Sequence, residues 1–173
     1  KSKKYPRAIQ SINEALDQDL DQNTKIRLAF LAGQISAQLN SNQEAIGYFE
    51  KVIKYHPEQY EKVFYSRLYI TRLTGGDLIG KFEDLLKNPN NEPYKGQIYY
   101  TMGETYRDNY DFQRAIEAYK KVDNPEITVN PTTKAKAFMA IADISFDSEL
   151  YAEARKYYEM SLGLISPNDN RYS

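Results

Sequence analysis

The chain has 173 residues, a formal net charge of −1 and no cysteine. The near-neutral charge argues against a dedicated nucleic-acid binder, which would need a basic face. The lack of cysteine excludes disulfides, zinc thiolate sites and cysteine nucleophiles. No run of about 18 apolar residues is present, so we expect no transmembrane segment in this stretch. The sequence opens with KSKKYPRA, without an initiator methionine or an apolar targeting segment, and we expect it to be a fragment of a longer protein.

Apolar residues recur at helical spacing along the chain, whereas alternation at period two is not sustained anywhere, and this predicts an all-α protein of about nine helices. Turn-forming stretches, among them TGGD and KNPNNEP, fall between the predicted helices. The longest connection, Asp123–Pro131, is the expected departure from a regular repeat. We expect one domain, 1–173, in which 1–22 is the second helix of a truncated repeat and helix pairs follow at 24–57, 58–90, 93–130 and 131–167.

Three segments share one internal spacing, which indicates a structural repeat. In each, a small residue is followed twelve residues later by alanine, and an aromatic residue comes four residues after that alanine. Pro57 and Pro167 close two of the units, while the pair at 58–90 has a degenerate motif whose phase stays undetermined. The three sets are Gly33, Ala45 and Phe49; Gly103, Ala115 and Tyr119; and Ala142, Ala154 and Tyr158.

Helix pairs with this glycine–alanine–aromatic–proline pattern resemble the tetratricopeptide repeat family. The resemblance implies a right-handed α-solenoid built from helix-turn-helix repeats, which stack on flanking repeats of the same chain. It also implies that the first helix of each pair lines an inner, concave surface and that this surface binds other proteins.

Gly103 lies inside a predicted helix, where glycine costs about 1 kcal/mol relative to alanine. We interpret Gly103 and Gly33 as positions where another helix backbone crosses, with the approach of a ligand as the alternative. His56 is the only histidine and precedes Pro57 at a predicted helix end, where a cation is mildly favourable. Without a second histidine or any cysteine, it predicts no metal site.

No catalytic motif is present, because the sequence lacks a glycine-rich phosphate loop, G-x-S-x-G and H-E-x-x-H. Two acidic pairs, Glu104/Asp108 and Asp143/Asp147, could carry acid–base chemistry in an enzyme. Their i, i+4 spacing is instead typical of solvated helix faces. We therefore expect a protein that is not an enzyme and that uses no cofactor or metal.

Removing the core positions from the predicted first helices leaves a second face, which mixes aromatic and charged side chains. Aromatic anchors in a polar surround are typical of protein-binding surfaces, so we expect a protein or peptide partner there. The alternative is that Tyr100, Met139 and Phe146 pack between repeats. Acidic residues would repel the carboxylate tails that some tetratricopeptide proteins grip with lysine and asparagine. The predicted partner-binding groove consists of Phe30, Gln34, Gln38, Tyr100, Glu104, Arg107, Asp108, Met139, Asp143, Phe146 and Asp147.

Two longer phrases, at 85–104 and 134–162, resemble the tetratricopeptide lipoproteins of Bacteroidetes gliding motility and type IX secretion, the SprE/PorW group. The shared features are a YxxQIYY-type helix start and a helix end related to AD-aromatic-F, here ADISF. This resemblance implies an envelope lipoprotein that connects parts of a secretion machine through protein contacts. It also implies a periplasmic location and a membrane anchor in the full-length protein, while a cytoplasmic location stays open.

Two further functions are open to the same sequence. One is a glycan-uptake (SusD-like) outer-membrane component, since such proteins embed tetratricopeptide helices. Their sugar platforms usually use tryptophan, however, and this chain has none. The other is a purely architectural segment that stacks only on flanking repeats of a longer array.

Overall fold

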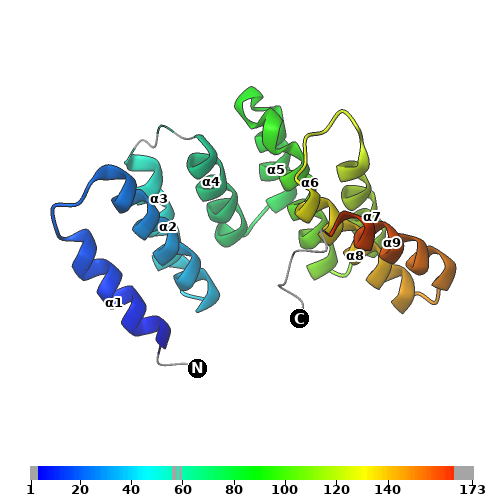
Figure 1. Ribbon diagram of the computed structural model, residues 1–173, viewed down its shortest axis with the longest axis horizontal. Helices are drawn as coiled ribbons and strands as arrows, with labels where there is room; N and C mark the ends of the chain where they lie inside the picture. The colour runs from blue at the N-terminus through cyan, green and yellow to red at the C-terminus, as the bar shows by residue number, and fades with distance from the viewer. Residues whose placement is uncertain (1–3, 56–57, 59, 166–173) are drawn as a thin grey trace. The chain divides into compact units, whose positions relative to one another are not determined.

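The structure, a computed structural model, describes residues 4–55, 58 and 60–165 (Figure 1). These residues form nine α-helices, two 3-10 helices and no strand, which confirms the predicted all-α class. The predictions for His56, Pro57 and Pro167 lie outside the described residues. In chain order the elements are α1 (Lys4–Leu16), α2 (Gln22–Gln38), α3 (Asn42–Lys54), α4 (Tyr60–Thr74), α5 (Leu78–Lys87), η1 (Pro89–Tyr94), α6 (Lys95–Asp108), α7 (Phe112–Lys120), η2 (Lys121–Asp123), α8 (Pro131–Asp147) and α9 (Tyr151–Leu164).

The helix bounds follow from local chemistry. The Asp111 carboxylate caps α7 by accepting from the backbone N–H of Arg114 at 3.2 Å, as the sequence predicts. The Asn130 side chain caps α8 in the same way. Gly75 and Gly76 have φ values of +66° and +76° and end α4, a conformation that glycine adopts without a Cβ clash. The predicted split between the two helices of this pair is therefore confirmed at these glycines.

The turns inside the α2–α3, α6–α7 and α8–α9 pairs each have one left-handed residue. Asn40, Tyr110 and Glu149 have φ values of 58°, 60° and 61°, and each lies between the first and second helix of its pair. Such a conformation is strained for a residue other than glycine. Its recurrence at one repeat position indicates that the three pairs share a backbone geometry as well as a sequence spacing.

The chain divides into two compact units, residues 1–78 and 79–173, and each is described by itself. In the first unit, Ile9 and Ile12 of α1 pack against Ala32 and Tyr48 of α2 and α3. The helix α1 thus joins the α2–α3 pair through a small apolar core.

The helix α4 covers the other side of the α2–α3 pair in this first unit. The Tyr69 ring stacks on the Phe49 ring with centroids 4.6 Å apart and an interplanar angle of 9°. Phe49 is fully buried as a result.

The second unit contains the α6–α7 and α8–α9 pairs around a core that includes Tyr119, Val122 and Ile141. The connection between the pairs packs on the start of α6, where a Cβ added to Gly96 would lie 2.5 Å from Val129 Cβ. Gly96 therefore makes room for the long connection that the sequence predicted as an irregularity.

Candidate protein-binding surface

The predicted groove residues lie on three first helices, α2, α6 and α8. The α2 residues belong to the first unit and the α6 and α8 residues to the second. We therefore describe two surfaces, one on each unit.

On α2, two of the three predicted residues are engaged by α4. The Phe30 ring packs edge-on against Tyr69 at 6.0 Å between centroids, and the Lys62 ammonium lies 4.8 Å from its centroid. The Gln34 amide donates to the Tyr69 hydroxyl at 3.2 Å. Gln38 is exposed at the end of the helix. This surface is consequently half-buried around Phe30, where the sequence predicted an open groove.

On α6, the Glu104 side chain forms its contacts within the α6–α7 pair. Its carboxylate accepts from the Tyr119 hydroxyl of α7 at 2.5 Å and pairs with Arg107 at 3.2 Å. Tyr100 is half-buried, with its ring 5.8 Å from that of Tyr119. Only Asp108 is exposed among the four predicted residues of this helix, and the other three are half-buried.

On α8, Asp143 repeats the arrangement of Glu104. Its carboxylate accepts from the Tyr158 hydroxyl of α9 at 2.7 Å. Met139, Phe146 and Asp147 are exposed along the same helix. Phe146 contacts the Tyr151 ring edge-on at 5.5 Å between centroids. The α8 surface therefore presents apolar and acidic side chains together, as the sequence predicted.

These hydrogen bonds have a clear electrostatic effect. Burial, followed by the hydrogen bond to Glu104, raises the pKa of the Tyr119 hydroxyl. The hydrogen bond to Asp143 raises the pKa of the Tyr158 hydroxyl. Both tyrosines stay protonated at neutral pH and donate to the carboxylates, Tyr119 to the half-buried Glu104 and Tyr158 to the exposed Asp143.

The explanation that the sequence suggested for the helical glycines is wrong in its detail. A Cβ on Gly103 would lie 2.5 Å from the Tyr119 ring, and a Cβ on Gly33 would lie 2.8 Å from the Phe49 ring. The neighbour is thus an aromatic ring of the second helix of the same pair, and no helix backbone crosses there. The glycines are needed because the ring occupies the space where a side chain would begin.

The sequence analysis did not predict the hydrogen bonds between these tyrosines and carboxylates, although both residues occupy fixed positions in the repeat. Each carboxylate directly follows the small residue of the repeat, and each tyrosine is the aromatic residue four positions after the repeat alanine. The 15-residue separation is the same in Glu104–Tyr119 and Asp143–Tyr158. It also missed Lys62 and Tyr69, because the phase of the α4 helix was undetermined.

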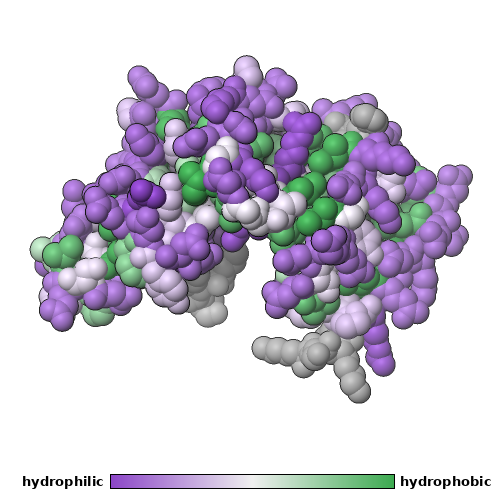
Figure 2. Space-filling view, turned by 180° about the vertical axis from the view of Figure 1, so that it is seen from behind, coloured by the Kyte–Doolittle hydropathy of each residue, from purple (hydrophilic) through white to green (hydrophobic). Residues whose placement is uncertain are grey.

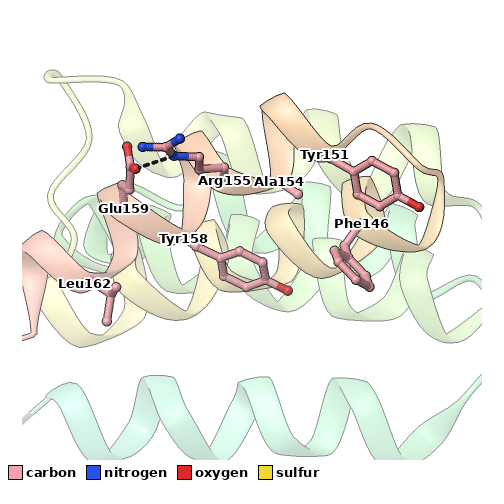
Figure 3. A pocket seen from close by; sticks show the side chains of 7 residues that line it. All are labelled: Phe146, Tyr151, Ala154, Arg155, Tyr158, Glu159 and Leu162. Carbon is pink, nitrogen blue, oxygen red and sulfur yellow. Dashed lines mark hydrogen bonds and ion pairs between the residues drawn. The ribbon is translucent and has the colours of Figure 1, made fainter.

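The described residues contain no group of three or more histidine, cysteine, aspartate or glutamate side chains that could hold a metal ion. Within that same part of the chain, no helix is long and apolar enough to cross a membrane. A shallow pocket lies on α9 and the end of α8 (Figure 3). It is lined by Phe146, Tyr151, Ala154, Arg155, Tyr158, Glu159 and Leu162.

Comparison with known proteins gave a family model and several solved structures of the same fold, two of which are described here. The tetratricopeptide repeat model matches residues 26–59 and 96–124, which fall largely on α2–α3 and α6–α7. The crystal structure of MamA is 19% identical, with a TM-score of 0.51 over 92% of this chain and 88% of that chain. The crystal structure of BtubC (BKLC) from P. vanneervenii is 14% identical, with a TM-score of 0.56 over 99% of this chain and 79% of that chain.

At these identities the two structures share the fold alone with this chain. A search of curated proteins gave no match. The SprE/PorW grouping receives no support from any of these comparisons. Over residues 26–59 and 96–124 the chain is therefore similar to the tetratricopeptide repeat family.

Proposed function

We propose that this chain is a protein-interaction scaffold that acts without chemistry of its own and that binds a partner on the α6 and α8 surface of its second unit. Met139 and Phe146 are the apolar anchors of this surface, and Asp108 and Asp147 form its acidic rim. The observation that carries the proposal is the exposure of two large apolar side chains beside exposed carboxylates on one helix.

The apolar anchors and acidic rim of this surface favour a basic or amphipathic peptide as the ligand. Apolar anchors supply most of the affinity when a partner excludes water from them, and rim charges chiefly select the partner and speed its arrival. Glu104 is half-buried and bound to Tyr119, so the exposed Asp108, Asp143 and Asp147 determine the charge that a partner meets first. A partner with lysine or arginine flanking an apolar residue fits this pattern.

Site-specific photo-crosslinking tests the proposal. A photoreactive residue at Met139 should capture a partner that the same residue at Gln113, on the exposed side of α7, does not capture. Asp108→Lys combined with Asp147→Lys should weaken that capture, whereas Glu117→Lys on α7 should leave it unchanged. Capture that is equal at Met139 and Gln113, or that survives the double charge reversal, would place the interface elsewhere.

We further propose, on the two phrases at 85–104 and 134–162, that the full-length protein serves a gliding or secretion machine in the cell envelope. A scaffold that presents a rigid apolar and acidic surface suits a protein that links other components. Fractionation of cells that express the full-length protein should then place it with the outer membrane. Recovery in the cytoplasmic fraction would reject the envelope role and leave the scaffold function intact.

A further inference from the structure

A shallow cavity of about 250 Å³ lies between α6 and α7 in the second unit. It shares no residue with the predicted groove, although both use side chains of α6. Apolar cavities of about 150 Å³ already take up a benzene ring, so this cavity has room for a single ring. The lining consists of Tyr99, Met102, Tyr106, Arg114, Glu117, Ala118 and Lys121.

The repeat spacing explains why the cavity is there. The residue fifteen positions after the small residue is Tyr48 in the α2–α3 pair and Tyr157 in the α8–α9 pair, and both tyrosines are buried. In the α6–α7 pair the same position holds Ala118, which lines the cavity. Because alanine has no ring, the α6–α7 pair has a cavity at the repeat position where the other two pairs hold a buried tyrosine.

The wall of the cavity suits an aromatic ring. On the α8–α9 pair, the Tyr157 ring contacts the Phe138 ring of α8 at 5.8 Å between centroids. The repeat equivalent of Phe138 on α6 is Tyr99, which lines the cavity. Aromatic pairs at such distances attract each other beyond the area that they bury. A ring beside Ala118 would therefore meet Tyr99 as Tyr157 meets Phe138.

A lysine completes the surroundings of the ring. The Lys51 ammonium lies over the Tyr48 ring, 5.2 Å from its centroid, and the Lys156 ammonium lies over the Tyr157 ring at 5.5 Å. Lys121 is the repeat equivalent of Lys51, and it lines the cavity. An ammonium group attracts the face of an aromatic ring within about 6 Å of the ring centroid. The α6–α7 pair thus keeps the cation of this arrangement and lacks the ring.

We propose that this cavity, the ring pocket, binds one tyrosine side chain of a partner protein in the space that Ala118 leaves open. The ring lies between Tyr99 and Lys121, and its hydroxyl donates to the Glu117 carboxylate. The ring pocket is a second interaction site beside the groove. It rests on the proposed scaffold function only in that a protein supplies the ring.

The rim of the ring pocket favours tyrosine as the residue and a protein as its carrier. The Tyr48 hydroxyl donates to the Asn13 side chain at 2.8 Å, and Glu117 supplies an acceptor at the ring pocket. Arg114, Glu117 and Lys121 are exposed and give the rim charges of both signs. Over α7 to α9, on the left of Figure 2, hydrophobic atoms reach the visible surface only in small patches among hydrophilic ones. An aromatic anchor in a polar surround is typical of a protein-binding surface.

The three methionines of the chain provide separate reporters for a test. Met102 lines the ring pocket, Met139 belongs to the groove and Met160 lies in α9. In protein labelled with carbon-13 at the methionine methyl groups, p-cresol should shift the NMR signal of Met102 and leave the other two in place. The control probe 4-methylcyclohexanol has the same hydroxyl and a similar size but no aromatic face. It should bind about two- to fivefold more weakly than p-cresol.

Two matched pairs of variants test the lining. Ala118→Tyr supplies the ring from the chain itself, so it should abolish the p-cresol shift, whereas Gln113→Tyr on the exposed side of α7 should preserve it. Lys121→Gln should weaken p-cresol binding by about two- to fivefold, whereas Lys120→Gln, outside the lining, should leave it unchanged. Circular dichroism reports whether each variant folds. If Ala118→Tyr does not fold, the lysine pair still decides the question.

A third pair of probes tests the source of the ring. N-acetyltyrosinamide carries the phenol ring on a peptide backbone and should shift the Met102 signal as p-cresol does. N-acetylphenylalaninamide has no hydroxyl to donate to Glu117 and should bind more weakly. Equal binding of these two probes would refute the preference for tyrosine. A shift with p-cresol but none with N-acetyltyrosinamide would assign the pocket to a free small molecule and overturn the protein partner.

Other results would overturn the ring pocket itself. They are a Met102 signal that p-cresol does not move, equal binding of p-cresol and 4-methylcyclohexanol, and a p-cresol shift that survives in folded Ala118→Tyr. A Met102 signal that moves with protein concentration alone would give the pocket to a tyrosine of a second copy. The groove is judged separately, because a partner that binds there moves the Met139 signal.

Discussion

The α6–α7 and α8–α9 pairs follow one repeat pattern, but they bury their aromatic residue to different extents. The Tyr119 ring packs against Gly103 and is fully buried. In the α8–α9 pair the residue equivalent to Gly103 is Ala142, and Tyr158 stays half-buried. Both hydroxyls donate to the carboxylate that follows the small residue. The hydrogen bond is therefore common to both pairs, whereas the burial of the tyrosine ring differs between them.

Two physical causes separate the pairs. The missing Cβ of Gly103 lets the Tyr119 ring approach the α6 backbone, which the methyl group of Ala142 prevents on α8. In addition, α8 covers the α6–α7 pair, and no described helix of the unit covers α8–α9. Repeat spacing alone thus predicts which residue meets which, whereas burial also depends on the neighbouring helix.

The largest expected effect comes from adding a methyl group at the glycine. Gly103→Ala places a Cβ 2.5 Å from the Tyr119 ring, so the ring or the helices must shift. We expect the free energy of unfolding to fall by about 1–3 kcal/mol, measured by urea denaturation. Gly163→Ala in α9 is the matched control, because nothing lies within 4 Å of its added Cβ, and it should be neutral or slightly stabilising. Equal effects at the two glycines would refute the packing argument.

The next effect is the loss of one hydroxyl group from either tyrosine. Tyr119→Phe removes a buried donor from Glu104 and should lower the free energy of unfolding by about 1–2 kcal/mol. Tyr158→Phe removes the equivalent bond at a more exposed site, where water can replace it, and should cost less. The two variants are compared by urea denaturation at pH 7. A larger loss for Tyr158→Phe would contradict the ranking of the two pairs.

The dependence of stability on pH distinguishes the buried tyrosine further. The pKa of Tyr119 in the folded protein is raised above the ordinary value of 10.0, so its contribution to stability is complete below pH 10. It is lost as the pH rises above 10 towards the folded pKa, by up to about 1.4 kcal/mol per pH unit, because the unfolded chain releases the proton first. Unfolding of wild type and Tyr119→Phe should be compared between pH 9 and about pH 11. The stability difference between them should narrow with rising pH, and a constant difference would contradict the shift.

The smallest effect concerns the turns, where the pairs differ in the left-handed residue. Glu149→Gly should raise the free energy of unfolding by about 0.5–1 kcal/mol, because glycine adopts a φ of 61° without strain. Asn40→Gly should change it less, since asparagine already tolerates this conformation. Thermal denaturation monitored by circular dichroism measures both. A greater gain at Asn40 would show that strain at Glu149 is relieved in some other way.

Several features of this chain could be predicted from the sequence, and each depends on local chemistry. The Asp111 cap depends on residues three positions apart, and the break at Gly75 and Gly76 depends on two adjacent residues. The pairing of Gly103 with Tyr119 was visible as a repeat spacing, although its partner was taken for a helix backbone. The predicted exposure of Met139 on α8 is also met.

Other features could not be predicted, because they join side chains that only the packed helices bring together. Glu104 was expected to face the groove, but its contact with the Tyr119 hydroxyl depends on the angle between α6 and α7. Phe30 was expected to be open, but Lys62 and Tyr69 of α4 pack on it. Sequence periodicity gives the face of a helix and leaves open which neighbour covers that face.

The sequence by itself determined the all-α class, the repeat positions and the small residues, because helical periodicity and the need for a small residue opposite a ring are short-range rules. The tertiary structure alone decided which carboxylates are bound inside a pair and which apolar faces stay uncovered. Those properties depend on the packing of a third helix against each pair. The residue spacing within one repeat does not specify that helix.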